Sequence, residues 1–342
     1  MTRMGPADPP GLAAMADQLR ALAGLQAKRD IQAPAAVFAH QPFPSLGPAA
    51  ALGDDAALLP PQAGGLLLAC EGMHPDLVQD DPWFAGWSGV LVNVSDIAAM
   101  GGRPLAVVNS LWSSNDHHAR ELLDGMRHAC DRFAVPMVGG HTNRHSPYNG
   151  LGVAVLGVAE GPVLSARAAR PGDQLWLLID ANGRFYRHHP FWDAATTADP
   201  ARLRAQLGLL PRLAAAGVVR AAKDISMGGL VGTAAMFAEA CGLALRIDLA
   251  AIERPAQVAE LAWLSCFPSF GFLLAVAPDR SEELRMLAAE QTNLLCCPIG
   301  SFESGAGGVR VEREGEQAVI WAGGEILTGF GAAETAKPLS SM

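Results

Sequence analysis

Hydrophobic and polar positions along the first half of the chain alternate between helix-like and strand-like patterns. Leu12, Leu19 and Leu22 recur at helical spacing, which predicts a surface helix over about residues 11–27. Runs of alternating or continuous apolar residues bounded by turn residues predict strands. The expected order after the first helix is strands at 51–59 and 64–72, a helix at 80–102, a strand at 104–112, a helix at 115–133, a strand that runs into a loop over 135–143, and a strand at 149–161.

A turn at Pro171-Gly172-Asp173 predicts the opening of a second block with the same alternation. Its expected elements are strands at 174–179, 243–248, 270–277 and 294–301, helices at about 200–215, 228–241, 255–264 and 279–292, and a strand pair near 308–321. We therefore expect a mixed α/β protein of the α+β type with two halves of similar size. The expected segments are a helix and loop at 1–45 that forms a candidate lid, domains at 46–165 and 166–331, and a flexible tail at 332–342.

Composition narrows the range of partners. Apolar residues make up 50% of the 342 residues and charged residues 17%, with a net charge of −9. This negative charge argues against nucleic acid or an anionic membrane as the main partner. No apolar run approaches the roughly 18 residues of a membrane span, and the start of the chain lacks the pattern of a signal peptide. The six cysteines form no CxxC pair, so we expect reduced core cysteines in a cytoplasmic protein.

Several familiar catalytic motifs are absent from the sequence. The three lysines do not occur in the GxxxxGK spacing of a phosphate loop, and no GxGxxG follows a strand. The HExxH and GxSxG motifs are missing as well, which removes zincin proteases and α/β-hydrolases from consideration. Any nucleotide site in this chain must be built in another way.

Dispersed acidic residues supply the candidate chemistry. In LGDDAALLP, Asp54 and Asp55 stand side by side within an apolar stretch, where like charges repel and lose hydration. Glu71 ends an apolar run, Asp96 lies near the C-terminal end of its helix, and Asp224 precedes a helix start. Such acids can converge on Mg²⁺, which prefers hard oxygen ligands. The alternatives are a turn at 54–55, a solvated strand end at Glu71 and a helix cap at Asp224.

Two glycine pairs are candidate phosphate-binding loops. Gly139-Gly140 precedes His141 in GGHTN, and Gly228-Gly229 lies at a helix start. Glycine lets the backbone approach a phosphate closely, although flexible turns explain both pairs equally well. His141 is either a hydrogen-bonded loop histidine or a ligand.

Together these segments resemble a known family. GDDAAL, NVSDIAAMGGRP, VGGHTN, ARPGD and KDISMGGL occur in the order typical of the aminoimidazole ribonucleotide synthetase (PurM-like) superfamily, which includes thiamine-monophosphate kinase, selenophosphate synthetase and HypE. The resemblance runs from about residue 50 to 330, and NVSDIAAMGGRP is its most specific part. It implies two α+β domains, with N-terminal domains that pair into an intersubunit β-barrel and a C-terminal α+β sandwich.

The resemblance also implies a cofactor and a set of site residues. ATP would lie at the homodimer interface with several Mg²⁺ ions, and the chemistry would be phosphoryl transfer. The implied metal ligands are Asp54, Asp55, Glu71, Asp96 and Asp224. The implied nucleotide-binding residues are Asp54, Asp55, Asn93, Asp96, Gly139, Gly140, Asp224, Gly228 and Gly229. Lys28 and His141 are the candidate catalytic residues, with Lys28 neutralising charge at the transferring group.

Some positions depart from the family pattern. Glu71 replaces the usual Asp, and Met227 stands where kinase-like members carry a second Asp. No cysteine precedes Cys70 and the chain ends in KPLSSM, so the chalcogen and carbamoyl chemistries are not expected. We expect an ATP- and Mg²⁺-dependent phosphotransferase or ATP-activating synthetase, related to selenophosphate synthetase, that acts on an unidentified small molecule. The alternatives are a non-catalytic nucleotide-binding sensor or partner subunit, and a carboxylate-metal hydrolase.

Overall fold

The fold is taken from a computed structural model, which describes residues 37, 63–291, 293–325 and 327–328. The expected helix at 11–27 and strand at 51–59 lie outside these residues, and so do Lys28, Asp54 and Asp55. The tail at 332–342 and, apart from Val37, the segment 1–45 also lie outside them.

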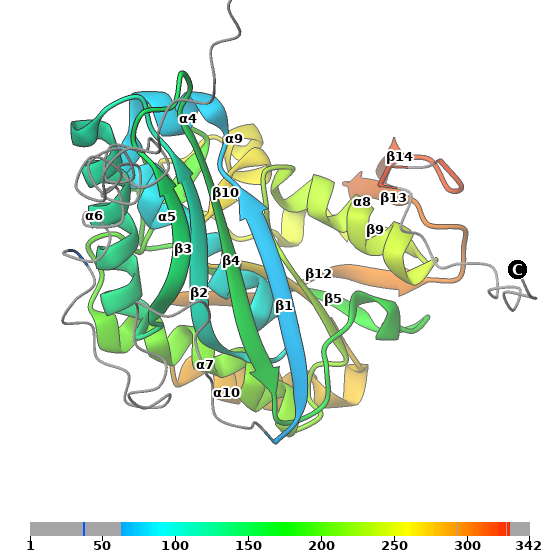
Figure 1. The fold of residues 1–342 in the computed structure, drawn as a ribbon. Helices are drawn as coiled ribbons and strands as arrows, with labels where there is room; N and C mark the ends of the chain where they lie inside the picture. Colours follow the sequence, from blue (N-terminus) through cyan, green and yellow to red (C-terminus); the bar gives the residue numbers. More distant parts are fainter. Residues whose placement is uncertain (1–36, 38–62, 292, 326, 329–342) are drawn as a thin grey trace, which may run out of the picture.

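The first half forms a four-stranded sheet backed by two long helices (Figure 1). Its strand order is β1 (Gly65–Gly72), β4 (Gly150–Ala159), β2 (Arg103–Trp112) and β3 (Met137–Asn143). The β1–β4 and β4–β2 pairs are antiparallel, and the β2–β3 pair is parallel. The helices are α5 (Pro82–Ala99) and α6 (Asp116–Phe133), and the short α4 (Pro75–Asp80) precedes them.

Local sequence explains why α5 begins and packs where it does. The Asp81 side chain accepts the Phe84 N–H at 3.4 Å, and Pro82 fits the first turn. Gly86 of α5 and Gly125 of α6 meet at the helix crossing. A Cβ at Gly86 would lie 2.1 Å from the Leu122 carbonyl oxygen, so only glycine permits this close approach.

The described residues of the second half form a seven-stranded sheet, a three-stranded sheet and four α-helices. The large sheet has the order β14 (Glu316–Trp321), β13 (Val309–Arg313), β9 (Ala244–Asp248), β12 (Leu294–Glu303), β5 (Gln174–Asp180), β11 (Gly271–Val276) and β8 (Ala221–Asp224). The small sheet has the order β10 (Phe267–Pro268), β7 (Phe191–Asp193) and β6 (Arg184–Phe185). The helices are α7 (Pro200–Ala215), α8 (Gly229–Cys241), α9 (Glu260–Ser265) and α10 (Ser281–Ala289).

Strand alternation in β5 distributes its side chains between two hydrophobic cores. Trp176 and Leu178 join the core that contains α5, α6 and α7, whereas Leu175, Leu177 and Ile179 join the core around α8. Successive residues of a strand point to opposite faces, so this one strand contributes to both cores. The first core therefore extends across both halves. The domain division at 165/166 stays a prediction.

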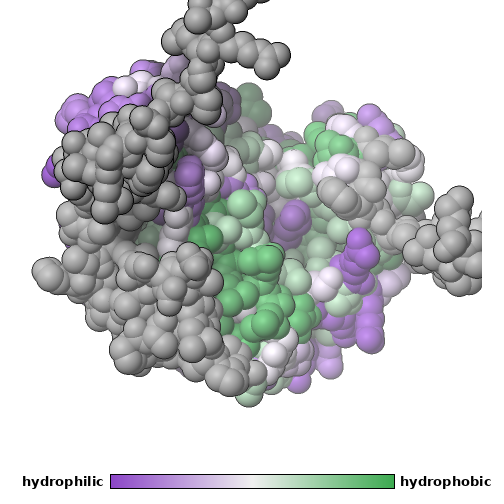
Figure 2. Space-filling model, in the orientation of Figure 1, coloured by the Kyte–Doolittle hydropathy of each residue, from purple (hydrophilic) through white to green (hydrophobic). Residues whose placement is uncertain are grey.

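The outer face of the four-stranded sheet carries exposed apolar side chains. Leu66 is 64% exposed and Leu68 80% exposed, and Val108 adds to the same surface. Figure 2 shows hydrophobic residues gathered over β1 and β4. Within the described part of this single chain the sheet is open, and the intersubunit barrel stays a prediction. No helix among the described residues is both long and apolar enough to cross a membrane.

Some local expectations were wrong. Gly139 and Gly140 lie within β3 rather than in a loop, because β3 pairs with β2 as far as Asn143. The helix expected at 255–264 starts only at Glu260, since a turn from Pro255 to Val258 occupies its first residues. All six cysteines are free as expected, but Cys70 is exposed on β1 rather than buried in a core.

Candidate functional site

A cavity of about 490 Å³ lies between α5 and elements of the second half of the chain. One face of α5 forms one wall, and β7 and β10 of the small sheet form the opposite wall. The end of β1 with the start of α4 closes one side, and residues at and after the end of β8 close another. The volume and the mixed polar and apolar lining suit a small-molecule site.

The wall contributed by α5 follows from helical periodicity. Its lining side chains are spaced three or four residues apart and share one face: Phe84, Trp87, Ser88, Leu91, Val92 and Asp96. From first to last they cover about 18 Å at 1.5 Å per residue. The aromatic side chains lie toward the N-terminal end of this face and the carboxylate toward its C-terminal end.

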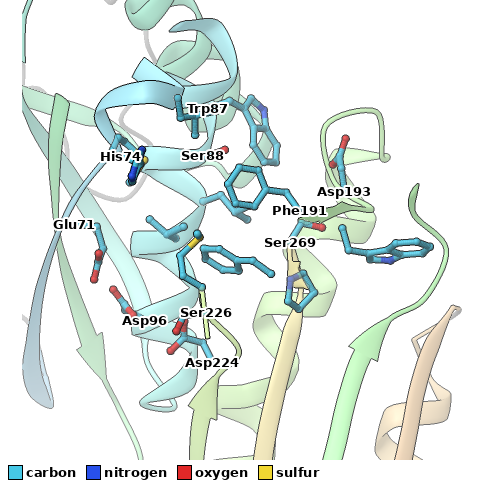
Figure 3. Close-up of a pocket in the computed structure, with 18 of the residues that line it drawn as sticks. Glu71, His74, Trp87, Ser88, Asp96, Phe191, Asp193, Asp224, Ser226 and Ser269 are labelled. Atoms are coloured by element: carbon cyan, nitrogen blue, oxygen red, sulfur yellow. The ribbon is translucent and has the colours of Figure 1, made fainter. Parts of the chain in front are cut away.

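Three carboxylates from separate elements meet at the C-terminal end of the α5 wall. Glu71 alternates with Leu67 and Ala69, which pack on the core, so its side chain points to the α5 side of the sheet. Asp224 is the last residue of β8. Figure 3 shows the carboxylates of Glu71, Asp96 and Asp224 pointing toward one another. The structure thus brings together three of the predicted acids.

Burial is the main cause that raises the pKa values of these three acids. Burial, followed by the negative charges of Asp224 and Glu71, raises the pKa of Asp96 to about 8. Partial removal from water and the charge of Asp224 raise the pKa of Glu71, while Lys223 acts in the opposite direction. Burial also raises the pKa of Asp224, again against the influence of Lys223. The ionised cluster therefore carries uncompensated negative charge that a cation would relieve.

The donor set fits a nucleotide-bound magnesium ion better than a resident metal. Among the residues that the structure describes, no three His, Cys, Asp or Glu side chains are close enough to hold a metal between them. Mg²⁺ needs only one or two protein carboxylates when phosphates and water supply its other ligands. Asp96 and Asp224 would hold such an ion, with Glu71 at the edge. The bound ion would neutralise phosphate charge.

The other predicted site residues that the structure describes do not line the cavity. His141, Gly139 and Gly140 are on β3, three strands and about 14 Å from β1 across the sheet. The exposed His141 ring instead lies beside Trp112, with 6.3 Å between the ring centroids. Asn93 is fully buried in α5, where its amide donates to the Gly89 carbonyl at 2.8 Å and its Oδ1 has no partner.

The Gly228-Gly229 pair has a packing explanation. Gly228 caps α8, and Gly229 has a positive φ of 63°. A Cβ at Gly229 would lie 2.5 Å from the Leu264 carbonyl oxygen of α9, so glycine is needed for the two helices to meet. The cap of α8 is therefore not Asp224, which ends β8, and the helix-cap alternative for Asp224 was wrong.

Aromatic side chains form the opposite end of the cavity, and contacts there link the two halves of the chain. The rings of Phe84 and Tyr186 stack at 3.6 Å between centroids, and Phe191 lies 6.0 Å from Phe84. Asp81, which caps α5, accepts the Tyr186 hydroxyl at 2.8 Å and pairs with Arg187 at 2.7 Å. Burial and the hydrogen bond to Asp81 raise the pKa of Tyr186. These contacts fix the small sheet against the start of α5.

The comparisons with known proteins agree with this two-part arrangement. Residues 53–159 match the AIR synthase related protein N-terminal domain, and residues 170–312 match its C-terminal domain. The chain belongs to the AIR synthase related family. The PurM-like resemblance and the mixed α/β fold class expected from the sequence are therefore confirmed.

Relatives of this AIR synthase related chain include proteins of several activities. It is 48% identical to protein sll0787 of Synechocystis over 77% of this chain and 81% of that protein. It is 30% identical to selenide, water dikinase of Pseudomonas aeruginosa over 73% of each chain. Among solved structures, HypE in complex with ATP matches with a TM-score of 0.68 and 18% identity, over 89% of this chain and 96% of that one. T. maritima PurL complexed with ATP gives a TM-score of 0.64 and 18% identity over 74% of this chain, which spans 42% of that protein.

Sequence analysis missed several residues that line the cavity of this AIR synthase related chain. Lys223 directly precedes Asp224 in KDISMGGL, so its position beside a candidate ligand was a usable signal. Phe191 and Phe267 have no such signal. They reach the cavity only through the three-stranded sheet, whose strands of two or three residues are too short to show a periodic pattern.

Proposed function

We propose that this AIR synthase related protein binds ATP with Mg²⁺ and transfers a phosphoryl group to a small molecule, or activates it in that way. The convergence of Glu71, Asp96 and Asp224 at one end of a cavity carries this proposal. Three carboxylates with raised pKa values favour either protons or a cation. Phosphoryl transfer depends mainly on positioning and on neutralisation of charge, which a magnesium ion held there would supply.

Relatives support nucleotide use. The structural neighbours HypE and T. maritima PurL were solved with ATP, and one relative is named selenide, water dikinase. In the proposed site Lys223 neutralises part of the phosphate charge next to Asp224. Asp54, Asp55 and Lys28, which lie outside the described residues, are proposed to complete the nucleotide site, while a catalytic role for His141 would require a second element to bring it closer.

We further propose that the protein acts as a homodimer through the exposed face of the four-stranded sheet. Leu66 and Leu68 present apolar side chains on an outer strand of that sheet, where a second copy would cover them. Sedimentation of the parent and of Leu68→Asp tests this contact. The proposal expects a dimer that the substitution dissociates, and a monomeric parent would contradict it.

The experiment that tests the nucleotide site is calorimetric titration of ATP in Mg²⁺ and then in EDTA. We expect binding in Mg²⁺ only, and its loss in Asp96→Asn. Asp131→Asn is the matched control, because Asp131 pairs with Arg127 on the exposed surface of α6. Equal Mg-ATP affinity in Asp96→Asn and the parent would refute the site.

A second function, nucleotide binding without turnover, is favoured by Met227. This residue follows Asp224 by three positions, lines the cavity and is 58% exposed. An acid at this position would be accessible for catalysis, whereas a methionine side chain cannot take that role. Consumption of ATP above the buffer background in the presence of candidate substrates separates the two functions. A protein that binds Mg-ATP and never consumes it would be a sensor or partner subunit.

A further inference from the structure

The two ends of the cavity differ in the charge they can accommodate. Of the described residues that line it, Lys223 alone is a lysine or arginine, and it lies at the carboxylate end. The remaining wall is dominated by apolar and aromatic side chains: Phe84, Trp87, Leu91, Phe191, Phe267 and Pro268. Apart from the exposed His74, no described lining residue of this part could pair with a phosphate as a cation, so a phosphate buried there would lose its hydration without compensation.

Aromatic geometry gives this part of the cavity a shape suited to a flat ring. Phe191 lies at its centre, 6.0 Å from Phe84 and 6.1 Å from Phe267, and it meets Phe267 edge to face at an interplanar angle of 81°. Rings placed in this way offer a face or an edge to a further aromatic ring. Phe191 and Phe267 are only half-buried, so part of each remains available for contact.

A polar group in the same part can orient a ring that carries an acceptor atom. Ser88 of α5 lines the cavity. By contrast, Asp193 is occupied within its own loop, where it accepts the Ala195 and Thr196 N–H groups at 2.9 Å. A neutral acceptor on a ligand would accept a hydrogen bond from the Ser88 hydroxyl, which can donate as well as accept.

From these observations we propose that the acceptor substrate is a flat aromatic or heteroaromatic molecule with a neutral hydrogen-bond acceptor and no phosphate group of its own. This inference rests on the proposed function, because it assigns the ring to the molecule that receives the phosphoryl group. The ring packs on the exposed parts of Phe191 and Phe267, and its reactive oxygen or nitrogen points toward Asp96 and Asp224.

The transfer balances with ATP as the only co-reactant. The acceptor atom forms a bond to the γ-phosphorus as the bond from that phosphorus to the β–γ bridging oxygen breaks. The bonding electrons leave with ADP, and the proton of the acceptor atom passes to solvent. The products are ADP and a phosphorylated ring compound. Its new negative charge lies beside the carboxylates of Asp96 and Asp224, and repulsion between these like charges favours release.

A matched pair of fluorescent probes tests the substrate class without nucleotide or metal. 4-Methylumbelliferone has a flat ring and a carbonyl acceptor, and 4-methylumbelliferyl phosphate adds only a phosphate to the same ring. Titration at a pH where the hydroxyl is neutral is expected to show that the parent ring binds at least tenfold more tightly than its phosphate ester. Equal or tighter binding of the ester, or no binding of either, would overturn the proposal.

Variants place the probe in the cavity. Phe191→Ala removes a ring contact and Ser88→Leu fills space next to Trp87, so each should weaken probe binding at least fivefold. Leu261→Ala is the control, since Leu261 is 77% exposed on α9 and does not line the cavity. Circular dichroism confirms that each variant is folded. If Ser88→Leu does not fold, the probe affinity of Phe191→Ala alone tests the assignment of the probe to the cavity. Unchanged probe binding in the folded variants would contradict that assignment.

Competition separates this inference from the proposed function. With Mg-ADP at saturation, the probe should bind with unchanged affinity, because nucleotide and acceptor occupy neighbouring positions. Mutually exclusive binding would show that the aromatic part holds the nucleotide base, which overturns the inference and leaves Mg-ATP binding intact. Failure of Mg-ATP binding in the earlier titration would instead refute the proposed function, whatever the probe does.

Discussion

At one end of the cavity, Glu71, Asp96 and Asp224 hold negative charges close together, and at the other end Phe84, Tyr186 and Phe191 form a stacked cluster. Burial, followed by the charges of neighbouring carboxylates, raises the pKa values of Glu71 and Asp96, so ionisation of the cluster destabilises the folded protein. The aromatic rings stabilise the fold through burial and stacking. Both ends border the same helix, α5, yet they contribute to stability with opposite signs.

This difference indicates which end is the candidate ligand site. A close group of charges that lowers stability in the free protein is typical of a binding or catalytic site. The aromatic end contributes to folding whether or not a molecule is bound. The hydrogen bond from Tyr186 and the ion pair with Arg187 on Asp81 also fix the second half against α5. Substitutions at the two ends should therefore separate stability from binding.

The largest effect is expected from Phe84→Ala. Phe84 is 4% exposed and stacks on Tyr186, so truncation leaves a cavity and removes an aromatic contact. We expect a loss of about 3–5 kcal/mol in the free energy of unfolding, measured by urea denaturation. Leu261→Ala should change it by less than about 0.5 kcal/mol. A similar loss of unfolding free energy in Phe84→Ala and Leu261→Ala would mean that the Phe84 contact does not link the two halves.

A smaller effect, on binding and not on folding, is expected from Asp224→Asn. Removal of one candidate ligand should weaken Mg-ATP binding by about 30-fold, or about 2 kcal/mol, while the free energy of unfolding is kept or raised. Calorimetry and urea denaturation of the same preparation give both values. A stability loss like that of Phe84→Ala would show that Asp224 has a structural role instead.

The smallest of the three effects is expected from Tyr186→Phe. The substitution removes the hydroxyl that donates to Asp81 at 2.8 Å but keeps the stack on Phe84 and the Arg187 ion pair. We expect a loss of about 1 kcal/mol in the free energy of unfolding and no change in Mg-ATP affinity. A binding defect without a stability loss would place Tyr186 in the nucleotide site.

Long periodic segments of the fold were predictable from the sequence. The helix expected at 80–102 appears as α5 with its Asp81 cap, and alternation in β1 explains the direction of Glu71. Asp96 was selected as a candidate ligand because its neighbours are apolar, and Asp224 because of its place in KDISMGGL; the structure places both beside the cavity, and their roles as ligands stay predictions. The aromatic wall was not predictable, because it is assembled by strands of two or three residues from distant parts of the chain.

The order of motifs in the sequence did not indicate how far apart the candidate site residues lie in the fold. Gly139 and Gly140 fit a phosphate-binding pattern in the sequence, but the sheet places them on β3, across the sheet from Glu71. Gly229 is explained by its close contact with α9, a constraint that exists only in the folded chain. Residue type therefore indicated the chemistry, while the tertiary fold decided which residues share a site.

The most direct test of the central claim is urea denaturation of the parent and Asp96→Asn between pH 5 and 8, with Mg²⁺ or with choline chloride at the same ionic strength. The pKa of Asp96 is raised to about 8 in the folded chain, against about 4 when unfolded. The folded parent therefore binds more protons over this range, and its stability should fall relative to Asp96→Asn as pH rises.

Mg²⁺ should reverse that loss in the parent at pH 8 and have little effect on Asp96→Asn. Asp131→Asn should follow the parent under every condition. This result would establish that the carboxylate cluster requires a cation. Parallel pH profiles for the parent and Asp96→Asn, with an equal response to Mg²⁺, would contradict the account.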